Sequence, residues 1–516
     1  MYNNTPNNFE YDECIAKGIC SIHPSISALE EVILLIIKQS AYYILKLKEL
    51  NINTKQAENT ILCMLTSVIS GASYSDEKLL SIISTSYKYH TNLREKYIEV
   101  CNDKDIKYQD LKLKIKISPD MSISNIISIG EKIFKSSTYN TEKKYIIDLI
   151  NILIKNTALN LIRYSEYIST EAELIKPILE ALNIQNHKQA SLSKYYKKIS
   201  ELSEINHVIQ KECSKYFVEN YGEITKTEVD FSSSKGKAIL VSGKSLSDLY
   251  NLLEYTKDKN IDIYTHDDLL MAHAYQTFKS YKNLKGQFGS CTDKCVLDFS
   301  TFPGAILLTK QFSMNLEYLY RGRLFTTAQI IPKGITGITD NNFEYLVKSA
   351  TESKGFAKGQ KRAKKIVGYN KKELITYLKK ISLKILNREI ENIFVLYPTS
   401  NFSSTYEKLI SKLTDKDFVL NFNDNEIKNI KNSITINLSF NNRMINEVLE
   451  YTFKSLKTDK SKYRFYFVNC DYATISDIIY YKTKGFSKLH LSNCTPNTIN
   501  PGLHKFITKL YDIEKY

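Results

Sequence analysis

A change in hydrophobic periodicity near residue 222 constrains the fold of this chain more than any other feature. From Pro24 to Tyr221, apolar residues recur every three or four positions, as at Leu29, Val32 and Ile36, which is typical of amphipathic helices. After Glu223, short apolar runs of strand length alternate with helical segments, which indicates a parallel sheet covered by helices. The sequence therefore predicts an all-α part followed by α/β domains.

The chain of 516 residues is too long for one compact core, so several domains are expected. The strand candidates of the α/β part are Ala238–Val241, Ile261–Tyr264, Ala305–Thr309, Ile393–Leu396, Phe418–Phe422, Ile434–Asn437, Arg464–Asn469 and Lys488–Leu491. A helical segment from Lys372 to Leu386 separates the first three strands from the others. We predict a helical-bundle domain over residues 1–222 and two Rossmann-like parallel-sheet domains over residues 223–383 and 384–516.

Polar residues follow the first predicted strands at the points where those strands end. The first strand turns on Gly243 into a helix, with Ser245 as the expected N-cap, and carries Lys244 in the turn. Asp268 follows the second strand, and Phe312 follows the third. Because ligands bind at the carboxyl ends of parallel strands, Lys244, Asp268 and Phe312 are expected to converge on one cavity.

Several ordered motifs extend across the α/β part of the chain. They are the turn Gly243-Lys244, the THxxxLxAHxYxxxKxYxxLxGxFG pattern from Thr265 to Gly289, the FPGAIL run from Phe302 to Leu307, the RxFTT pattern from Arg323 to Thr327, and the segments Val367–Asn370 and Gly485–Leu491. In this order they resemble the hybrid-cluster proteins, also called prismane or hydroxylamine-reductase proteins, which are relatives of the carbon monoxide dehydrogenases. The resemblance implies a helical N-terminal domain followed by two α/β domains.

The resemblance also implies an iron–sulfur–oxygen cluster held by one histidine, two glutamates and four cysteines where the domains meet. Here the histidine position holds Lys244 and the two glutamate positions hold Asp268 and Asp471. The four cysteine positions fall at Phe312, Thr399, Asp424 and Asn441. Since iron–sulfur clusters need thiolate ligands, we expect no cluster and no other cofactor in this chain.

Two alternatives describe the altered site. In the first, Lys244 pairs with Asp268 or Asp471, so that an ion pair fills the cavity. In the second, Asp268, Asp424 and Asp471 bind a hard divalent ion through oxygen, although the ammonium of Lys244 would repel it. The neighbouring His266 could transfer protons or serve as a hydrogen-bonded structural residue, and a structural role is also expected for His273.

The nine cysteines are expected to be reduced, because the sequence shows no secretion signal. Cys14 and Cys20 resemble the second half of the family's N-terminal iron–sulfur motif, but no cysteine precedes them, so they are interpreted as a relic or as half of a site shared across a dimer. The pair Cys291 and Cys295 is a weak candidate for metal binding. The other cysteines lie outside the family ligand positions, namely Cys63, Cys101, Cys213, Cys470 and Cys494.

The net charge of +15 raises the question of an anionic partner. Lys is abundant throughout, and the basic segment from Lys354 to Lys372 is interpreted as a solvated surface, so nucleic acid is not the expected partner. The apolar run Val32–Ile37 is too short to cross a membrane, and the first ten residues are polar. We therefore expect a cytoplasmic protein without a membrane partner.

Three functions remain open from the sequence. The first is a hybrid-cluster-like protein without its cluster, acting as a partner, scaffold or regulator, in a homo-oligomer or with a cluster-bearing relative. The second is an oxidoreductase of the hydroxylamine or nitric oxide reductase type with an altered metal cofactor. The third is a basic nucleic-acid-associated protein.

Overall fold

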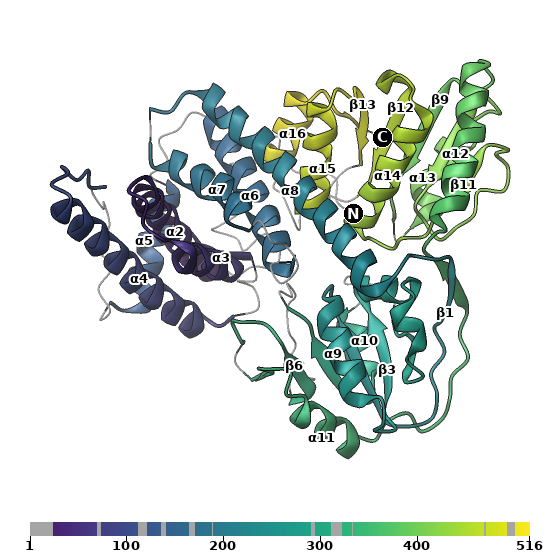
Figure 1. Cartoon of the computed structure of the whole chain (residues 1–516), viewed down its shortest axis with the longest axis horizontal. Coiled ribbons are helices and arrows are strands. Elements are labelled where there is room, and N and C mark those ends of the chain that lie inside the picture. Colours follow the sequence, from purple (N-terminus) through teal and green to yellow (C-terminus); the bar gives the residue numbers. More distant parts are fainter. Residues whose placement is uncertain are drawn as a thin grey trace, which may run out of the picture.

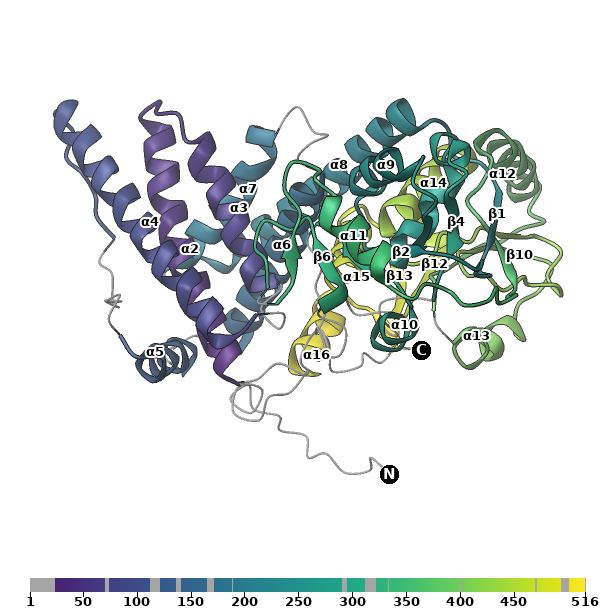
Figure 2. The ribbon, with the colours of Figure 1, turned by 90° about the horizontal axis from the view of Figure 1, so that it is seen from below.

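The computed structural model describes residues 24–69, 74–111, 121–135, 141–164, 171–187, 189–289, 295–310, 322–332, 334–399, 401–468, 471–492 and 501–515. The first part is helical, with α2 (Pro24–Glu49), α3 (Lys55–Ile69), α4 (Asp76–Asp103), α5 (Ile123–Lys135), α6 (Thr141–Tyr164), α7 (Glu171–Asn183) and α8 (Leu192–Tyr221). Two views at right angles place this part at one end of the long axis and the α/β parts at the other (Figure 1 and Figure 2).

Helix α8 connects the helical part to the α/β parts. Its 30 residues span about 45 Å, and its apolar face, with Ile199, Ile209 and Phe217, is buried. The helix ends at Gly222, whose φ of +82° favours glycine and whose N–H donates to the carbonyl of Val218. Figure 1 shows α8 running diagonally from the other helices to the junction of the α/β parts.

The first α/β part contains a six-stranded parallel sheet in the order β4-β3-β2-β5-β6-β7. Its strands are β2 (Ala238–Ser242), β3 (Asp262–His266), β4 (Leu284–Gln287), β5 (Ala305–Leu308), β6 (Leu324–Thr326) and β7 (Thr336–Gly337), and its helices include α9 (Leu246–Thr256), α10 (Cys295–Thr301), α11 (Glu344–Glu352) and the 3-10 helices η4 (Asp267–Ala274) and η5 (Thr277–Ser280). The chain begins at the centre and builds outward first on one side and then on the other, which is the doubly wound Rossmann order.

The second α/β part repeats this topology in the order β11-β10-β9-β12-β13-β14. Its strands are β9 (Asn392–Leu396), β10 (Asp417–Asn421), β11 (Ser433–Thr435), β12 (Tyr463–Phe467), β13 (Lys488–Leu491) and β14 (Glu514–Lys515), and its helices are α12 (Lys371–Leu386), α13 (Phe402–Ile410), α14 (Asn442–Leu456), the 3-10 helix η8 (Lys460–Lys462), α15 (Tyr472–Thr483) and α16 (Pro501–Leu510). All neighbouring strands in this sheet are parallel.

The predicted fold class, a helical part followed by two Rossmann-like sheets, is confirmed. Each predicted strand is present with ends shifted by at most two residues, while β1 (Thr227–Asp230) and β8 (Lys364–Val367), which pair antiparallel, were not predicted. The sequence also missed β4, β6, β7 and β14, since runs of two to four residues carry no periodic signal. Within the described residues, no strand precedes β1.

Helix α6 packs against α3, α7 and α8 of the helical part and against α15 and α16 of the second α/β part. Residues 142–164 are long and apolar enough to cross a membrane by length and composition, and no other helix in the described ranges meets that test. In the fold, 72% of the tested window is buried among other elements. This burial is that of a core helix of a globular domain.

Candidate functional site at the domain junction

A cavity of about 180 Å³ lies where the helical part and the two α/β parts meet. Its walls come from α6 and α8, from the residues that follow β2 and β3, and from the first turns of α14 and α15. Both sheets therefore direct the carboxyl ends of their strands toward this cavity, as doubly wound sheets do at their ligand sites. The lining contains two arginines, one lysine and two aspartates, namely Arg163, Arg443, Lys244, Asp268 and Asp471, and no cysteine among the described residues.

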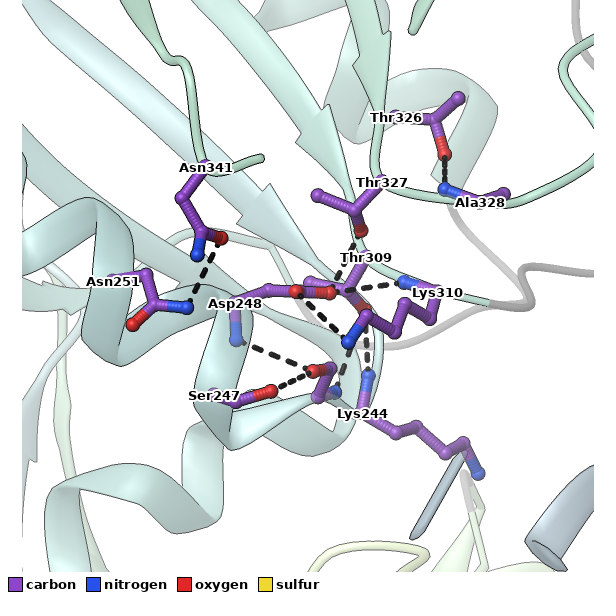
Figure 3. A network of polar contacts seen from close by, with 11 residues as sticks. Lys244, Ser247, Asp248, Asn251, Thr309, Lys310, Thr326, Thr327, Ala328 and Asn341 are labelled. Carbon is purple, nitrogen blue, oxygen red and sulfur yellow. Dashed lines mark hydrogen bonds and ion pairs between the residues drawn. The ribbon is translucent and has the colours of Figure 1, made fainter. Parts of the chain in front are cut away.

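The turn after β2 fixes the position of Lys244. Gly243 adopts a φ of +130°, and Thr309 Oγ1 accepts the backbone N–H of Lys244 at 3.1 Å. The buried carboxylate of Asp248 supports the same turn, because its Oδ2 accepts the backbone N–H of Lys310 and the hydroxyl of Thr327. Figure 3 shows the side chain of Lys244 leaving this network and pointing away from Asp248.

Lys244 forms an ion pair with Asp268, one of the two partners that the sequence analysis offered. The Nζ of Lys244 lies 2.8 Å from Oδ2 of Asp268, whose side chain is 5% exposed, while the lysine side chain is 35% exposed. Burial lowers the pKa of Lys244, but the Asp268 carboxylate more than offsets this, and the pKa lies above its ordinary value. The lysine is therefore a charged and partly solvated partner of a buried carboxylate.

Helix α6 adds polar side chains that the sequence analysis did not single out. Asn156, Asn160 and Arg163 line the cavity with spacings of four and three residues, which places them on one helical face. Within the described part of the chain, Arg163 has no hydrogen-bond or ion-pair partner, and its Nε is buried. A polar stripe at helical spacing inside an apolar helix was the available sequence signal.

Arg443, in the first turn of α14, connects all three parts of the molecule. Its side chain is buried, and it donates from Nη1 to Ser214 Oγ on α8 at 2.8 Å and from Nη2 to the hydroxyl of Tyr275 at 3.0 Å. The guanidinium also stacks over Phe217 at 4.7 Å from the ring centre. No local pattern in the sequence marks this residue, because its partners are far away in the chain.

Two of the four cavity residues predicted from the second α/β part line the cavity, and both are helix N-caps. Asn441 Oδ1 accepts the backbone N–H of Met444 at the start of α14, and Asp471 Oδ1 accepts that of Thr474 at the start of α15. Asp471 lies beyond ion-pair distance of Lys244, so the lysine pairs with Asp268 alone of the two aspartates. Lys244, Asp268, Asn441 and Asp471 thus line one cavity, as the predicted convergence requires.

The other predicted cavity residues lie elsewhere. His266 is fully buried between Ser242, at 2.9 Å from Nδ1, and Asp298, at 3.2 Å from Nε2, so a structural role is supported over proton transfer in the cavity. His273 is also structural, because its Nε2 lies 2.9 Å from Thr265 Oγ1 and burial lowers its pKa to about 4. Thr399 is not a lining residue, and its N–H donates to Asn423.

The alternative in which Asp268, Asp424 and Asp471 bind one divalent ion does not hold for Asp424. Its carboxylate lies 2.6 Å from the ammonium of Lys365 and lines a different cavity, because the chain has turned away from the junction three residues after β10. No group of three or more His, Cys, Asp or Glu side chains with metal-binding geometry occurs in the described ranges. Phe312 lies outside these ranges.

The cysteines contribute no ligand set within the described residues. Cys101 and Cys213 are buried and Cys63 is partly buried, which is typical of core and boundary positions. Cys295 begins α10, while Cys14, Cys20, Cys291, Cys470 and Cys494 lie outside the described residues.

In the sequence, only Glu373 adjoins the basic segment from Lys354 to Lys372. In the structure, carboxylates from elsewhere in the chain neutralise two of its lysines. Lys364 pairs with Glu228 at 2.7 Å, and Lys365 pairs with Asp424. Both carboxylates come from distant segments.

Comparison of the sequence with known protein families identifies the family of this chain. The sequence profile described as Prismane/CO dehydrogenase family matches residues 10–484. The chain belongs to the prismane/CO dehydrogenase family. The resemblance drawn from the sequence is therefore confirmed, although the match ends before the motif at Gly485–Leu491.

Curated members of the family that resemble this chain are named hydroxylamine reductase. The protein of Acidiphilium cryptum is 23% identical over 384 residues, covering 74% of this chain and 69% of its own. The protein of Gloeothece citriformis is 26% identical over 402 residues, covering 74% of this chain and 71% of its own. A solved alpha subunit of acetyl-CoA synthase/carbon monoxide dehydrogenase, described with NiZn[Fe4S4] and NiNi[Fe4S4] clusters, aligns over 96% of this chain and 81% of its own at 10% identity and a TM-score of 0.47.

Proposed function

We propose that this chain is a prismane/CO dehydrogenase family protein whose junction cavity holds no iron–sulfur–oxygen cluster, and that it acts as a non-catalytic partner, scaffold or regulator. The observation that carries the proposal is the composition of the cavity wall. Two guanidinium groups and one ammonium group line it, and the described lining includes no thiol.

These side chains do not fit an iron–sulfur cluster. Iron in such clusters needs thiolate donors. The ammonium and guanidinium groups of this cavity are positively charged, so they repel iron and cannot act as its ligands. Lys244 occupies the position where the family resemblance implies a histidine, and its ion pair engages one of the two carboxylates. Arg443 is fixed by Ser214 and Tyr275, so its guanidinium cannot leave the wall without breaking both hydrogen bonds.

Iron and acid-labile sulfide analysis of protein purified without oxygen tests the proposal. We expect a colourless protein with far less iron than one four-iron cluster per chain, and no absorption from sulfide-to-iron charge transfer. Lys244→His should leave the iron content unchanged, because one imidazole cannot replace the missing thiolates. Stoichiometric iron with sulfide would refute the proposal.

An oxidoreductase with an altered metal cofactor is the competing function, supported by relatives named hydroxylamine reductase. It requires a group that stores electrons, so it predicts a bound metal and reductant oxidation that depends on hydroxylamine. The same anaerobic preparation serves for both measurements. Metal-free protein without that activity would favour the non-catalytic role.

The non-catalytic role requires a partner. We expect a homo-oligomer or a complex with a cluster-bearing relative, and Cys14 and Cys20 are the candidates for a site shared across a dimer. Light scattering after size-exclusion chromatography, alone and after co-expression with such a relative, measures the assembly. A strict monomer that forms no complex with the relative would contradict this part of the proposal.

A further inference from the structure

The junction cavity is surrounded by the positive ends of three helices. Leu246 begins α9, Asn442 begins α14 and Tyr472 begins α15, and all three residues line the cavity. The first N–H groups of a helix have no partner within the helix, and together with the helix dipole they favour a negative charge. A carboxylate offsets two of these starts, because Asp471 caps α15 and Asp248 lies in the first turn of α9, whereas α14 begins without a neighbouring acid.

Unpaired hydrogen-bond donors line the same cavity. Asn156 is 3% exposed, and its Nδ2 has no partner in the described part of the structure. The buried Nε atoms of Arg163 and Arg443 are also unpartnered there. One acceptor, Oδ1 of Asp268, is left without a partner, so the unsatisfied donors outnumber it. Buried donors of this kind are costly unless a ligand or water accepts from them.

Arg163 is the cation of the described wall that has no carboxylate within ion-pair distance, although Asp268 and Asp267 attract it from farther away. Lys244 is paired with Asp268 at 2.8 Å, and Glu447, behind the wall, lies 3.9 Å from Arg443. Asp471 is engaged as the N-cap of α15. No carboxylate of the described residues lies within ion-pair distance of Arg163, whose pKa is lowered by burial.

From these observations we propose that the cavity binds a small oxyanion, with Arg163 as its principal ligand and Asn156 and Arg443 as further donors. A guanidinium offers two parallel N–H groups that match the oxygens of phosphate, sulfate or a carboxylate. The volume of about 180 Å³ accommodates a free ion of this class with a few waters. The inference rests on the proposed absence of a cluster, since both would occupy the same space.

Calorimetric titration at constant ionic strength tests the proposal with inorganic phosphate, sulfate and acetate as separate probes and with chloride as the background salt. We expect saturable binding of one ion per chain. The oxyanion that binds most tightly identifies the class, because phosphate and sulfate are tetrahedral and acetate is planar. Heats that do not saturate with any of the three ions would overturn the proposal.

Arg163→Gln should weaken binding on the order of 10-fold or more, because it removes a charge-assisted contact. Arg163→Lys should weaken it less, since it keeps the charge and loses only the two-pronged geometry. Arg388→Gln makes the same charge change at an exposed position and should leave the affinity unchanged. Equal affinity in Arg163→Gln and Arg388→Gln would overturn the proposal.

Two further measurements keep the outcome decisive. If Arg163→Gln does not fold, Asn156→Ala is measured instead. It should weaken anion binding several-fold, because it removes about one hydrogen bond. Unchanged affinity in this variant would count against the site. Iron analysis of the same preparation separates the two proposals. If the protein is free of metal and binds none of the three anions, the anion site alone is refuted. If the protein contains a full cluster, the proposed function is refuted as well.

Discussion

At the scale of single residues, the ion pair between Lys244 and Asp268 determines the chemistry of the junction. The carboxylate is almost fully buried and the ammonium is about one third exposed, so the pair lies between the limits of a buried and a surface salt bridge. The ion pair stabilises the charge of Asp268 more than that of Lys244, because water solvates the partly exposed lysine and hardly reaches the carboxylate.

Lys244→Met should lower the free energy of unfolding by about 2 kcal/mol, since it leaves the Asp268 carboxylate buried without its cation. The partial exposure of Lys244 keeps the cost below that of a dry ion pair. Urea unfolding measures it. The control is Lys285→Met, because Lys285 is 38% exposed and lies 3.6 Å from the more exposed Asp262, so its loss should cost less than about 1 kcal/mol. Equal costs would contradict a special role for Lys244.

Asp477 is a second residue with a measurable electrostatic effect. It is buried beside the cavity residues of α14, and burial raises its pKa from 3.8 to about 6, although Asn442 and Asn446 donate hydrogen bonds to it. The folded protein therefore holds this proton more tightly than the unfolded chain. Between about pH 3 and pH 7 stability is lost as the pH rises, by about 3 kcal/mol for this group.

Asp477→Asn should remove that loss. The free energy of unfolding of the variant relative to the parent should therefore rise by about 3 kcal/mol between pH 3 and pH 7. Chemical unfolding at a series of pH values measures it. Glu391→Gln removes one exposed carboxyl group and controls for the change in net charge. A constant difference between Asp477→Asn and the parent would contradict the raised pKa.

At the scale of elements, the turn between β2 and α9 carries the site. A Cβ at Gly243 would lie 2.0 Å from Thr309 Oγ1, the atom that accepts the N–H of Lys244. The positive φ and this close approach both require glycine. The strand-to-helix turn and the neighbouring strand β5 therefore position Lys244 together.

Gly243→Ala should cost about 3 kcal/mol and displace Lys244, because it combines backbone strain with a clash that Thr309 cannot avoid without losing its hydrogen bond. Gly236→Ala is a matched control, since Gly236 has a similar φ of +145° but no atom within 4 Å of the added Cβ. It should cost about 1 kcal/mol from strain alone. Thermal unfolding compares the stabilities of the two variants. A similar loss of stability in both would show that the Thr309 side chain can move away from the added methyl group at little cost.

At the scale of the whole molecule, Arg443 connects the three parts through one guanidinium. Arg443→Met would leave Ser214 and Tyr275 without their donor and remove a bridge between α8, the first α/β part and α14. We expect a loss of about 3 kcal/mol and faster proteolysis between the parts. Arg464→Met is the control, because Arg464 bonds to Asn392 inside the second sheet, and it should cost about 1 kcal/mol without new cleavage sites. The same cleavage pattern in both variants would contradict a connecting role.

The sequence alone was enough to predict a helical part followed by two Rossmann-like sheets, to indicate the family, and to narrow the partner of Lys244 to Asp268 or Asp471. These depend on periodicity, on ordered motifs and on residues that follow adjacent parallel strands, all of which are local in the chain or fixed by sheet geometry. The folded structure was needed to learn that Asp424 pairs with Lys365, that His266 is enclosed, and that Arg163 and Arg443 line the cavity. The physical reason is that these contacts join segments distant in the chain, whose meeting depends on how the domains pack and not on any local pattern.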